Sequence, residues 1–332
     1  MPPGIGGISI SSKRLYDKLQ KDGYDVHYYD LKFKNPKYNN KLGLIIRFFI
    51  LPFYIASHKK YDVIHCHVSG VLRRVYIGLF KWLYKKACLI MTIHGDARNL
   101  IRRRAGVWAL KKADKIICVQ AGDSCKMPES IRHKCIDIPA FIMPDVVTEK
   151  DVPRYILDFV KNGNTPIIMA CGGIVLTNEF YDLYGIQDTI NLFREIEKVN
   201  MQCRLLLIVY GDISSPKQQD FMNKIKEQTA QDSNILLVTY EQFELYPLFR
   251  YVSIYVRPTK TDGDSLTIRE ALSMRCPVVA SDKAQRPAGT CVYHTTDDFL
   301  KITQKILLGK EGIVQDGVYD FYDSIREQYE VN

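Results

Sequence analysis

Residues 261–282 read TDGDSLTIREALSMRCPVVASD and join a polar loop, an amphipathic helix and a short apolar strand. The apolar spacing predicts the helix over residues 265–274 and the strand over residues 278–280. The first turn of such a helix offers free N–H groups and the positive end of the helix dipole, which suit a diphosphate. Asp262 lies on the loop and Glu270 in the helix, so the two carboxylates can hold separate hydroxyl groups of one extended ligand.

Short apolar strands alternate with amphipathic helices on both sides of this segment, which is typical of parallel βαβ units. The expected strands are residues 25–29, 63–67, 89–93, 115–119, 135–138, 166–171, 204–209, 235–239, 253–256 and 278–280. The expected helices are residues 11–22, 69–85, 99–113, 188–198, 218–231, 245–249, 265–274 and 319–329. The chain is long enough for two α/β domains of about 150 residues each. We therefore predict doubly wound sheets, whose ligands sit beyond the carboxyl ends of the strands.

A proline-containing stretch separates the two halves. Residues 139–161 contain three prolines and show no clear periodicity until Tyr155, so we expect the linker between domains here. The predicted domains are residues 1–145 and residues 155–317. We expect the final segment, residues 318–332, to cross back onto the first domain.

Charge is divided unevenly along the chain, whose formal net charge is +9. Residues 1–150 hold 27 lysines and arginines against 12 acidic residues, whereas the remainder holds 19 against 25. A basic face attracts phosphates, whether on nucleic acid, on anionic lipid headgroups or on a lipid-pyrophosphate substrate. Charge alone does not choose among these partners.

The nine cysteines are scattered and form no Cys-x-x-Cys pair, a pattern typical of buried thiols in a reducing cytosol. His65 and His67 flank Cys66 on an expected strand, where alternate side chains share one face. No further ligand cluster lies nearby in the sequence, so we expect no metal site there.

An apolar run at residues 42–56 is 15 residues long and contains Arg47 and Pro52. A helix needs about 20 residues to span a bilayer, so this run does not cross a membrane. It is either a buried helix broken at Pro52 or a monotopic surface that dips into a membrane interface. The sequence leaves both interpretations open.

Residues 262–281 resemble the Glu-x7-Glu region of family-4 glycosyltransferases, whose usual form is EGFGLxxLEAMACGxPVVAS, and align with it without gaps. The resemblance covers nearly the whole chain. It includes LLLIVYGD and LFRYVSIYVRPT in the second half, at residues 205–212 and 248–259. In the first half it includes residues 4–26, 61–67, 92–96 and 110–120. The resemblance implies the GT-B fold, two Rossmann-like domains that face a cleft.

The same resemblance implies a retaining sugar transfer from a nucleotide-sugar donor, with no metal and no cofactor. Asp262 replaces the first Glu and would hold hydroxyls of the transferred sugar, while Glu270 would hold the ribose hydroxyls. His94 would stand in the active site, where an imidazole can donate to a phosphate or a hydroxyl. The other expected donor-binding residues are Gly172, Gly173, Gly263, Asp264, Ser265, Leu266, Thr267 and Arg269. The expected acceptor-side residues are Gly6, Gly7 and His67.

Two cations of the family pattern are absent. The family places an Arg just after the Gly of the first strand of the nucleotide domain and a Lys about six residues later, but residues 169–188 read MACGGIVLTNEFYDLYGIQD. Both cations neutralise the leaving diphosphate, whose charge grows in the transition state. We expect one of four nearby cations to replace them: Arg257, Lys260, Arg269 or Arg286. We favour Arg257 as a catalytic residue, because it ends a strand where the family has an apolar residue.

The chain also departs from the family at its start. Residues 1–7 read MPPGIGG, so no apolar strand precedes the glycine loop. That first strand is central in a doubly wound sheet, and its absence would remove two ladders. We therefore expect Met1 to be an internal methionine of a chain that begins upstream.

These features together predict a hexosyltransferase-type enzyme of bacterial surface-polysaccharide assembly, such as O-antigen or capsule. We expect a cytoplasmic protein, peripheral at the inner face of the cell membrane, with a glycan or lipid-pyrophosphate-linked acceptor. The basic residues that favour this acceptor are Arg73, Arg74, Arg102, Arg103 and Arg104. A nucleic-acid partner is disfavoured, because basic residues are not interleaved with exposed aromatic residues. Two alternatives stay open: a non-catalytic GT-B relative that binds or scaffolds, and a GT-B sugar-nucleotide epimerase.

Overall fold

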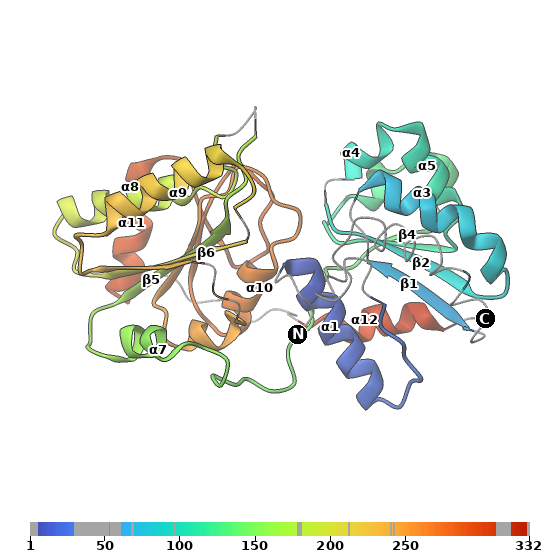
Figure 1. Cartoon of the computed structure of the whole chain (residues 1–332), viewed down its shortest axis with the longest axis horizontal. Coiled ribbons are helices and arrows are strands. Elements are labelled where there is room, and N and C mark those ends of the chain that lie inside the picture. Colours follow the sequence, from blue (N-terminus) through green and yellow to red (C-terminus); the bar gives the residue numbers. More distant parts are fainter. Residues whose placement is uncertain are drawn as a thin grey trace. The chain divides into compact units, whose positions relative to one another are not determined.

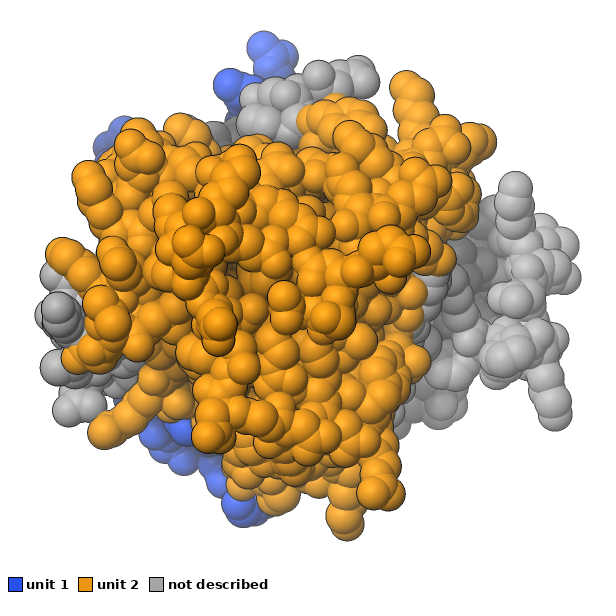
Figure 2. All heavy atoms as spheres, turned by 90° about the vertical axis from the view of Figure 1, so that its left-hand side faces the viewer, with its two compact units in different colours: residues 1–143, 320–332 blue, residues 144–319 orange. Residues whose placement is uncertain are grey.

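The computed structural model describes residues 6–29, 53, 61–67, 70–95, 97–177, 181–211, 213–239, 241, 243–309 and 320–330. The apolar run at residues 42–56 therefore lies outside the described residues, except for Phe53. The chain divides into two compact units (Figures 1 and 2). Unit 1 comprises residues 1–143 and 320–332, and unit 2 comprises residues 144–319. Each unit has its own parallel sheet, which confirms two parallel α/β domains.

Unit 2 is built on a six-stranded parallel sheet with the order β10-β9-β8-β5-β6-β7. Its strands are β5 (Ile167–Gly173), β6 (Arg204–Tyr210), β7 (Ile235–Thr239), β8 (Ile254–Arg257), β9 (Val278–Ser281) and β10 (Cys291–Tyr293). The order advances from β5 to β7 on one side and from β8 to β10 on the other. The winding therefore reverses between β5 and β8, and ligands of doubly wound sheets bind at such a switch point.

Helices cover both faces of the unit 2 sheet (Figure 1). One face carries α8 (Ile186–Lys198), α9 (Pro216–Thr229) and α11 (Thr296–Leu307). The other carries α7 (Arg154–Lys161), the 3₁₀ helix η4 (Tyr246–Arg250) and α10 (Leu266–Ser273). Strand β5 is buried along its whole length, because apolar side chains of both faces pack against helices.

Unit 1 contains a four-stranded parallel sheet with the order β1-β2-β3-β4. Its strands are β1 (Val63–His67), β2 (Cys88–Ile93), β3 (Lys115–Cys118) and β4 (Cys135–Asp137). One face packs against α3 (Val71–Leu79), α4 (Ala97–Ile101), α5 (Arg104–Lys111) and α6 (Glu129–Arg132). The other face packs against α1 (Gly7–Lys21) and α12 (Tyr322–Arg326). Short 3₁₀ helices complete the unit: η2 (Phe80–Tyr84), η3 (Ser124–Lys126) and η5 (Glu327–Tyr329).

The end of the chain is attached to unit 1 by apolar and polar contacts. Tyr322 and Ile325 of α12 join the core that includes Leu15 of α1. The Tyr322 hydroxyl donates to the Asp22 carboxylate at 2.6 Å. The side chain of Lys115 in β3 donates to the backbone oxygen of Gln328 at 2.7 Å. Residues 320–330 are therefore an integral layer of unit 1.

The strand expected at residues 25–29 is wrong, since these residues have no regular secondary structure. Within the described residues, β1 pairs with β2 on one side and with no strand on the other. An extended segment without a neighbouring strand has no ladder to join. The described part of unit 1 likewise shows no strand before α1, and residues 1–5 are not described.

Three further elements of unit 2 differ from expectation. The stretch 139–161, expected as a linker, ends in the helix α7, which packs on the unit 2 sheet. Strand β10 and helix α11 are additional. Helix α11 starts with a capping box, in which Thr295 and Asp298 exchange side-chain and backbone hydrogen bonds. This Thr-x-x-Asp pattern was a signal for a helix start that the sequence reasoning missed.

The helix expected over residues 99–113 is two helices, because the backbone is extended at Arg103 between α4 and α5. The break folds α5 onto the end of α4. A Cβ atom on Gly106 would stand 2.4 Å from the carbonyl oxygen of Leu100. Only glycine fits such an approach without displacement of the backbone.

We expect Gly106→Ala to lower the free energy of unfolding of unit 1 by about 1–3 kcal/mol, as overpacking does elsewhere. Both tryptophans, Trp82 and Trp108, belong to unit 1, so their fluorescence during urea unfolding reports on this unit alone. The exposed neighbour Ala105 supplies the control, since Ala105→Ser should stay within about 0.5 kcal/mol of the wild type. Equal stability of both variants would contradict the tight contact.

Candidate functional site

The carboxyl ends of β5 and β8 meet at the switch point of unit 2. The two strands pair at Met169 and Tyr255. Beyond this pair, Arg257 joins them through its side chain, because its Nη1 donates to the Cys171 carbonyl at 3.0 Å. Arg257 is the last residue of β8 and is only 4% exposed. Its guanidinium therefore lies where ligands of doubly wound sheets bind.

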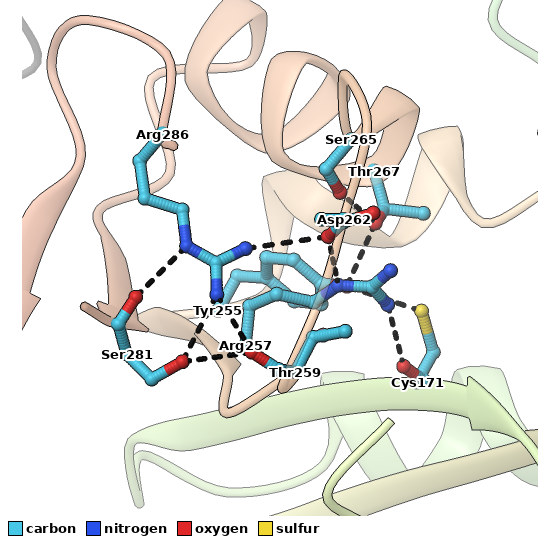
Figure 3. Close-up of polar contacts among 9 residues, drawn as sticks. All are labelled: Cys171, Tyr255, Arg257, Thr259, Asp262, Ser265, Thr267, Ser281 and Arg286. Atoms are coloured by element: carbon cyan, nitrogen blue, oxygen red, sulfur yellow. Dashed lines mark hydrogen bonds and ion pairs between the residues drawn. The ribbon is translucent and has the colours of Figure 1, made fainter. Parts of the chain in front are cut away.

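The Asp262 carboxylate lies between two guanidinium groups (Figure 3). Its Oδ2 accepts from Nε of Arg257 at 3.1 Å and from Nη1 of Arg286 at 3.3 Å. Arg286 is also fixed by backbone oxygens, since Nε donates to Ser281 at 2.9 Å and Nη2 to Thr259 at 3.1 Å. Two buried cations thus share one carboxylate, and these three side chains carry one net positive charge.

The pKa values of the two arginines reflect this sharing. Burial acts to lower the pKa of Arg257, but Asp262 together with Tyr255, Tyr210 and Cys171 outweighs it, and the pKa is held well above the usual value. For Arg286, burial lowers the pKa, Asp262 offsets part of the change, and the nearby charge of Arg257 lowers it further. Both guanidinium groups stay protonated at neutral pH.

The other two candidate cations are each matched by a carboxylate of their own. Lys260 forms an ion pair with Asp188 of α8. Arg269 donates through Nε to both carboxylate oxygens of Asp264 at 2.7 Å. The excess positive charge of this region therefore comes from Arg257 and Arg286.

The first turn of α10 follows this charged cluster. Ser265 is its N-cap residue, but its side chain makes no capping hydrogen bond to the helix. Its hydroxyl lies 3.3 Å from that of Thr267, which in turn lies 2.8 Å from the Tyr255 hydroxyl. Because the Ser265 side chain does not cap the helix, the first N–H groups of α10 can donate to an anion. The expected pyrophosphate contacts at residues 265–267 lie in this turn.

Glu270 is buried in α10, with 2% of its surface exposed. Burial chiefly, and the Glu270 carboxylate to a smaller degree, raise the pKa of the Cys171 thiol. Glu270 therefore lies near the carboxyl end of β5. The structure brings Asp262 and Glu270 to the same switch point from a loop and a helix.

Aromatic residues that the sequence reasoning missed line the end of β5. A Cβ atom on Gly172 would stand 2.6 Å from Cβ of Tyr184, so Gly172 makes room for this tyrosine. The Tyr184 ring centroid lies 5.0 Å from the guanidinium carbon of Arg257, a cation–π distance. On Gly173, a Cβ atom would stand no closer than 3.4 Å to a neighbouring atom, the Tyr210 carbonyl oxygen, which is an ordinary contact distance. The two glycines thus differ, with Gly172 required by packing.

Unit 1 places histidines at the carboxyl edge of its own sheet. His67 ends β1, and His94 follows β2. Nδ1 of His67 lies 3.0 Å from Nε2 of His94. His65 is bound instead between Thr92 and Tyr329, each at 2.7 Å. Gly6 and Gly7, at the start of α1, cap and begin that helix.

All three histidines are neutral at neutral pH. Burial lowers the pKa of His67 to about 4. Burial, His67 and then Arg74 hold the pKa of His94 well below its usual value. Burial and the two neighbouring histidines do the same to the pKa of His65.

The hydrogen bond between His67 and His94 fixes their tautomers. It joins one donor to one acceptor. Nε2 of His67 is buried and has no partner within the described residues. Since a buried unpaired N–H group is rarer than an unpaired acceptor, we assign the His67 proton to Nδ1. His94 then carries its proton on Nδ1, where it can donate to a substrate oxygen.

In the described part of the chain, no three or more His, Cys, Asp or Glu side chains are grouped so that they could hold a metal ion. No helix among those residues is both long and apolar enough to span a membrane.

Two α/β units with parallel sheets, and a cluster of buried charges at the switch point of the second, are consistent with a GT-B glycosyltransferase fold. Residues 5–122 match the family model described as Glycosyltransferase Family 4. Residues 167–307 match the one described as Glycosyl transferases group 1. Both units therefore carry a glycosyltransferase domain.

Solved structures share this fold at low sequence identity. Anabaena HepE in complex with UDP and glucose has a TM-score of 0.64 and 11% identity, covering 98% of this chain and 92% of that one. A UDP-forming α,α-trehalose-phosphate synthase from Burkholderia xenovorans, in complex with glucose-6-phosphate, has a TM-score of 0.60, 14% identity and coverages of 97% and 85%. A Rickettsia africae glycosyltransferase has a TM-score of 0.62, 13% identity and coverages of 98% and 90%. No curated protein matches the chain in sequence.

The buried histidines make the stability of unit 1 depend on pH. As pH falls below about 6.5, His67 of the unfolded chain binds a proton, while the folded His67, with its pKa of about 4, does not. Unfolding is therefore favoured as pH falls. Between pH 7 and pH 5, the free energy of unfolding of the wild type should therefore fall. In His67→Asn, which keeps a donor near the Nδ1 position, we expect this fall to be about 2 kcal/mol smaller. Urea unfolding followed by tryptophan fluorescence measures this, and equal losses in both proteins would contradict it.

Proposed function

We propose that this protein transfers a sugar from a nucleotide-sugar donor to a glycan or lipid-pyrophosphate-linked acceptor, with retention of configuration, in cell-surface polysaccharide assembly. The observation that carries the proposal is the pair Arg257 and Arg286, which share the single carboxylate of Asp262 at the switch point. The excess positive charge suits the diphosphate of such a donor.

In this proposal the leaving diphosphate binds between the arginines and the first turn of α10. Within the described residues, Arg257 uses Nε and Nη1 in hydrogen bonds, which leaves Nη2 for a phosphate oxygen. The guanidinium is already held by Asp262 and the Cys171 carbonyl. It therefore stabilises the charge that grows on the leaving group without reorganisation during the reaction. The leaving phosphate would assist attack by the acceptor from the same face.

The two carboxylates would hold the hydroxyl groups of the donor. Asp262 uses Oδ2 for both arginines, and Oδ1 has no partner among the described residues. Oδ1 can therefore accept from the transferred sugar, while Glu270 accepts from the ribose. No metal or cofactor is required by this arrangement, because arginines and backbone N–H groups supply the positive potential.

The basic first half favours an anionic acceptor and a peripheral position at the cytoplasmic face of the membrane. Its excess of lysine and arginine falls in the residues matched by the Family 4 model. Anionic lipid surfaces attract such a distribution. His94, with its proton on Nδ1, would donate a hydrogen bond to substrate.

A panel of nucleotide sugars tests the function directly. Each sugar nucleotide is incubated with the protein, and binding and released nucleotide are both measured. Release of nucleoside diphosphate with one donor supports the transferase and identifies its donor. Binding without release over hours contradicts it and supports a non-catalytic relative. Conversion of the bound sugar nucleotide to an epimer contradicts it in favour of the epimerase.

We expect Arg257→Met to lower kcat by about 100- to 1,000-fold, the usual loss when one oxyanion-type donor is removed. Methionine is preferred to alanine, because Arg257 is buried against Tyr184 and alanine would also leave a cavity. Turnover of the identified donor measures the effect.

The matched control is Arg194→Met on α8, which removes an arginine that pairs with Glu197 and Asp232. This control should keep near-normal turnover. If Arg257→Met also keeps near-normal turnover, Arg257 does not replace the missing cations.

A further inference from the structure

Unit 1 contains a buried arginine that has no carboxylate beside it. Arg74 of α3 is 5% exposed. It donates through Nη1 to the backbone oxygen of Gly70 at 3.2 Å, while its Nε is buried without a partner among the residues that the structure describes. No carboxylate among the described residues lies within ion-pair distance of it. Arg257 of unit 2 is equally buried, but Asp262 neutralises it.

A buried, uncompensated cation is strongly unfavourable for the folded state. Burial lowers the pKa of Arg74 to about 10, and no charge among the described residues raises it again. The group is nevertheless protonated at neutral pH. The free protein therefore holds a positive charge that an external anion would neutralise.

Arg74 lies at the edge of the sheet where ligands are expected. It is the fourth residue of α3, the helix that follows the carboxyl end of β1. Its charge is close enough to His94 to lower the pKa of that imidazole. His94 follows β2, so the two residues come from adjacent strands and their connections. A guanidinium and an imidazole N–H group at the same edge of the sheet are donors that suit phosphate oxygens.

We propose that Arg74 and His94 bind a phosphoryl group of the acceptor substrate on unit 1. This rests on the proposed function, because it assigns the acceptor side of that reaction to a phosphate-bearing molecule. The donor diphosphate has its own cations in unit 2, so the two substrates are held by separate sets of charges. The acceptor is then a sugar phosphate or a lipid phosphate, and not a neutral glycan.

The test compares Arg74→Met with the wild type in phosphate-free buffer and with inorganic pyrophosphate. Tryptophan fluorescence during urea unfolding reports on unit 1, where Arg74 lies. In the wild type, pyrophosphate raises the unfolding midpoint, because it binds only the folded state. In Arg74→Met, the midpoint without anion is equal or higher, since an unneutralised buried charge has been removed, and pyrophosphate no longer raises it.

Two further variants keep the test decisive. Lys111→Met removes an exposed positive charge of α5 and should keep the full response to pyrophosphate. Arg74→Lys keeps the charge and should keep part of the response. The proposal is overturned if Arg74→Met responds to pyrophosphate as the wild type does, whatever its midpoint without anion, because the anion then binds without Arg74.

The source of the phosphoryl group is identified with octyl phosphate, below its micelle concentration, and glucose 1-phosphate. If octyl phosphate raises the unfolding midpoint of the wild type but not of Arg74→Met, the acceptor is lipid-linked. If glucose 1-phosphate does so, the acceptor is a soluble sugar phosphate. If neither probe nor pyrophosphate raises the wild-type midpoint, the site is refuted. These measurements need no donor and no turnover. A failure of the nucleotide-sugar panel is therefore distinguishable from a failure of this site.

Discussion

The carboxylate of Asp262 is the interaction on which the candidate donor site depends. It allows two guanidinium groups to lie buried at the end of a parallel sheet, where a single uncompensated arginine would be unfavourable. Through Arg257 it also connects the loop after β8 to the backbone of β5. Removal of this one carboxylate would leave two buried guanidinium groups without their shared counter-charge. It would also remove one of the two hydrogen bonds by which Arg257 joins the loop after β8 to β5.

Under the proposed function, the charge arrangement places leaving-group stabilisation and sugar recognition in one segment. In the family pattern, the cations follow the first strand of the nucleotide domain, whereas Arg257 and Arg286 flank the loop and helix that carry Asp262 and Glu270. Packing is consistent with this shift, because Tyr184 fills the space beside Gly172 and its ring lies against Arg257.

Sequence periodicity predicts both sheets well, because buried parallel strands are nearly continuous apolar runs. The expected strands lie within two residues of β1 to β9, and the parallel α/β domains are confirmed. The strand at residues 25–29 fails since pairing depends on a neighbour that local sequence does not reveal. The candidate site is harder to predict. Sequence places Asp262 and Arg257 near each other. It does not predict the sharing of Asp262 with Arg286, the packing of Tyr184, or that no carboxylate of the described residues pairs with Arg74.

The attachment of residues 320–330 to unit 1 has a consequence for the order of events during synthesis. Unit 2 is continuous in sequence and can complete its core as soon as residue 319 has left the ribosome. Unit 1 is made first, yet its core lacks Tyr322 and Ile325 until the last residues emerge. The usual order, in which the N-terminal domain folds first, is therefore disfavoured. A nascent chain would carry an unfinished first domain beside a finished second one, with apolar surface of α1 and β2 open to chaperones.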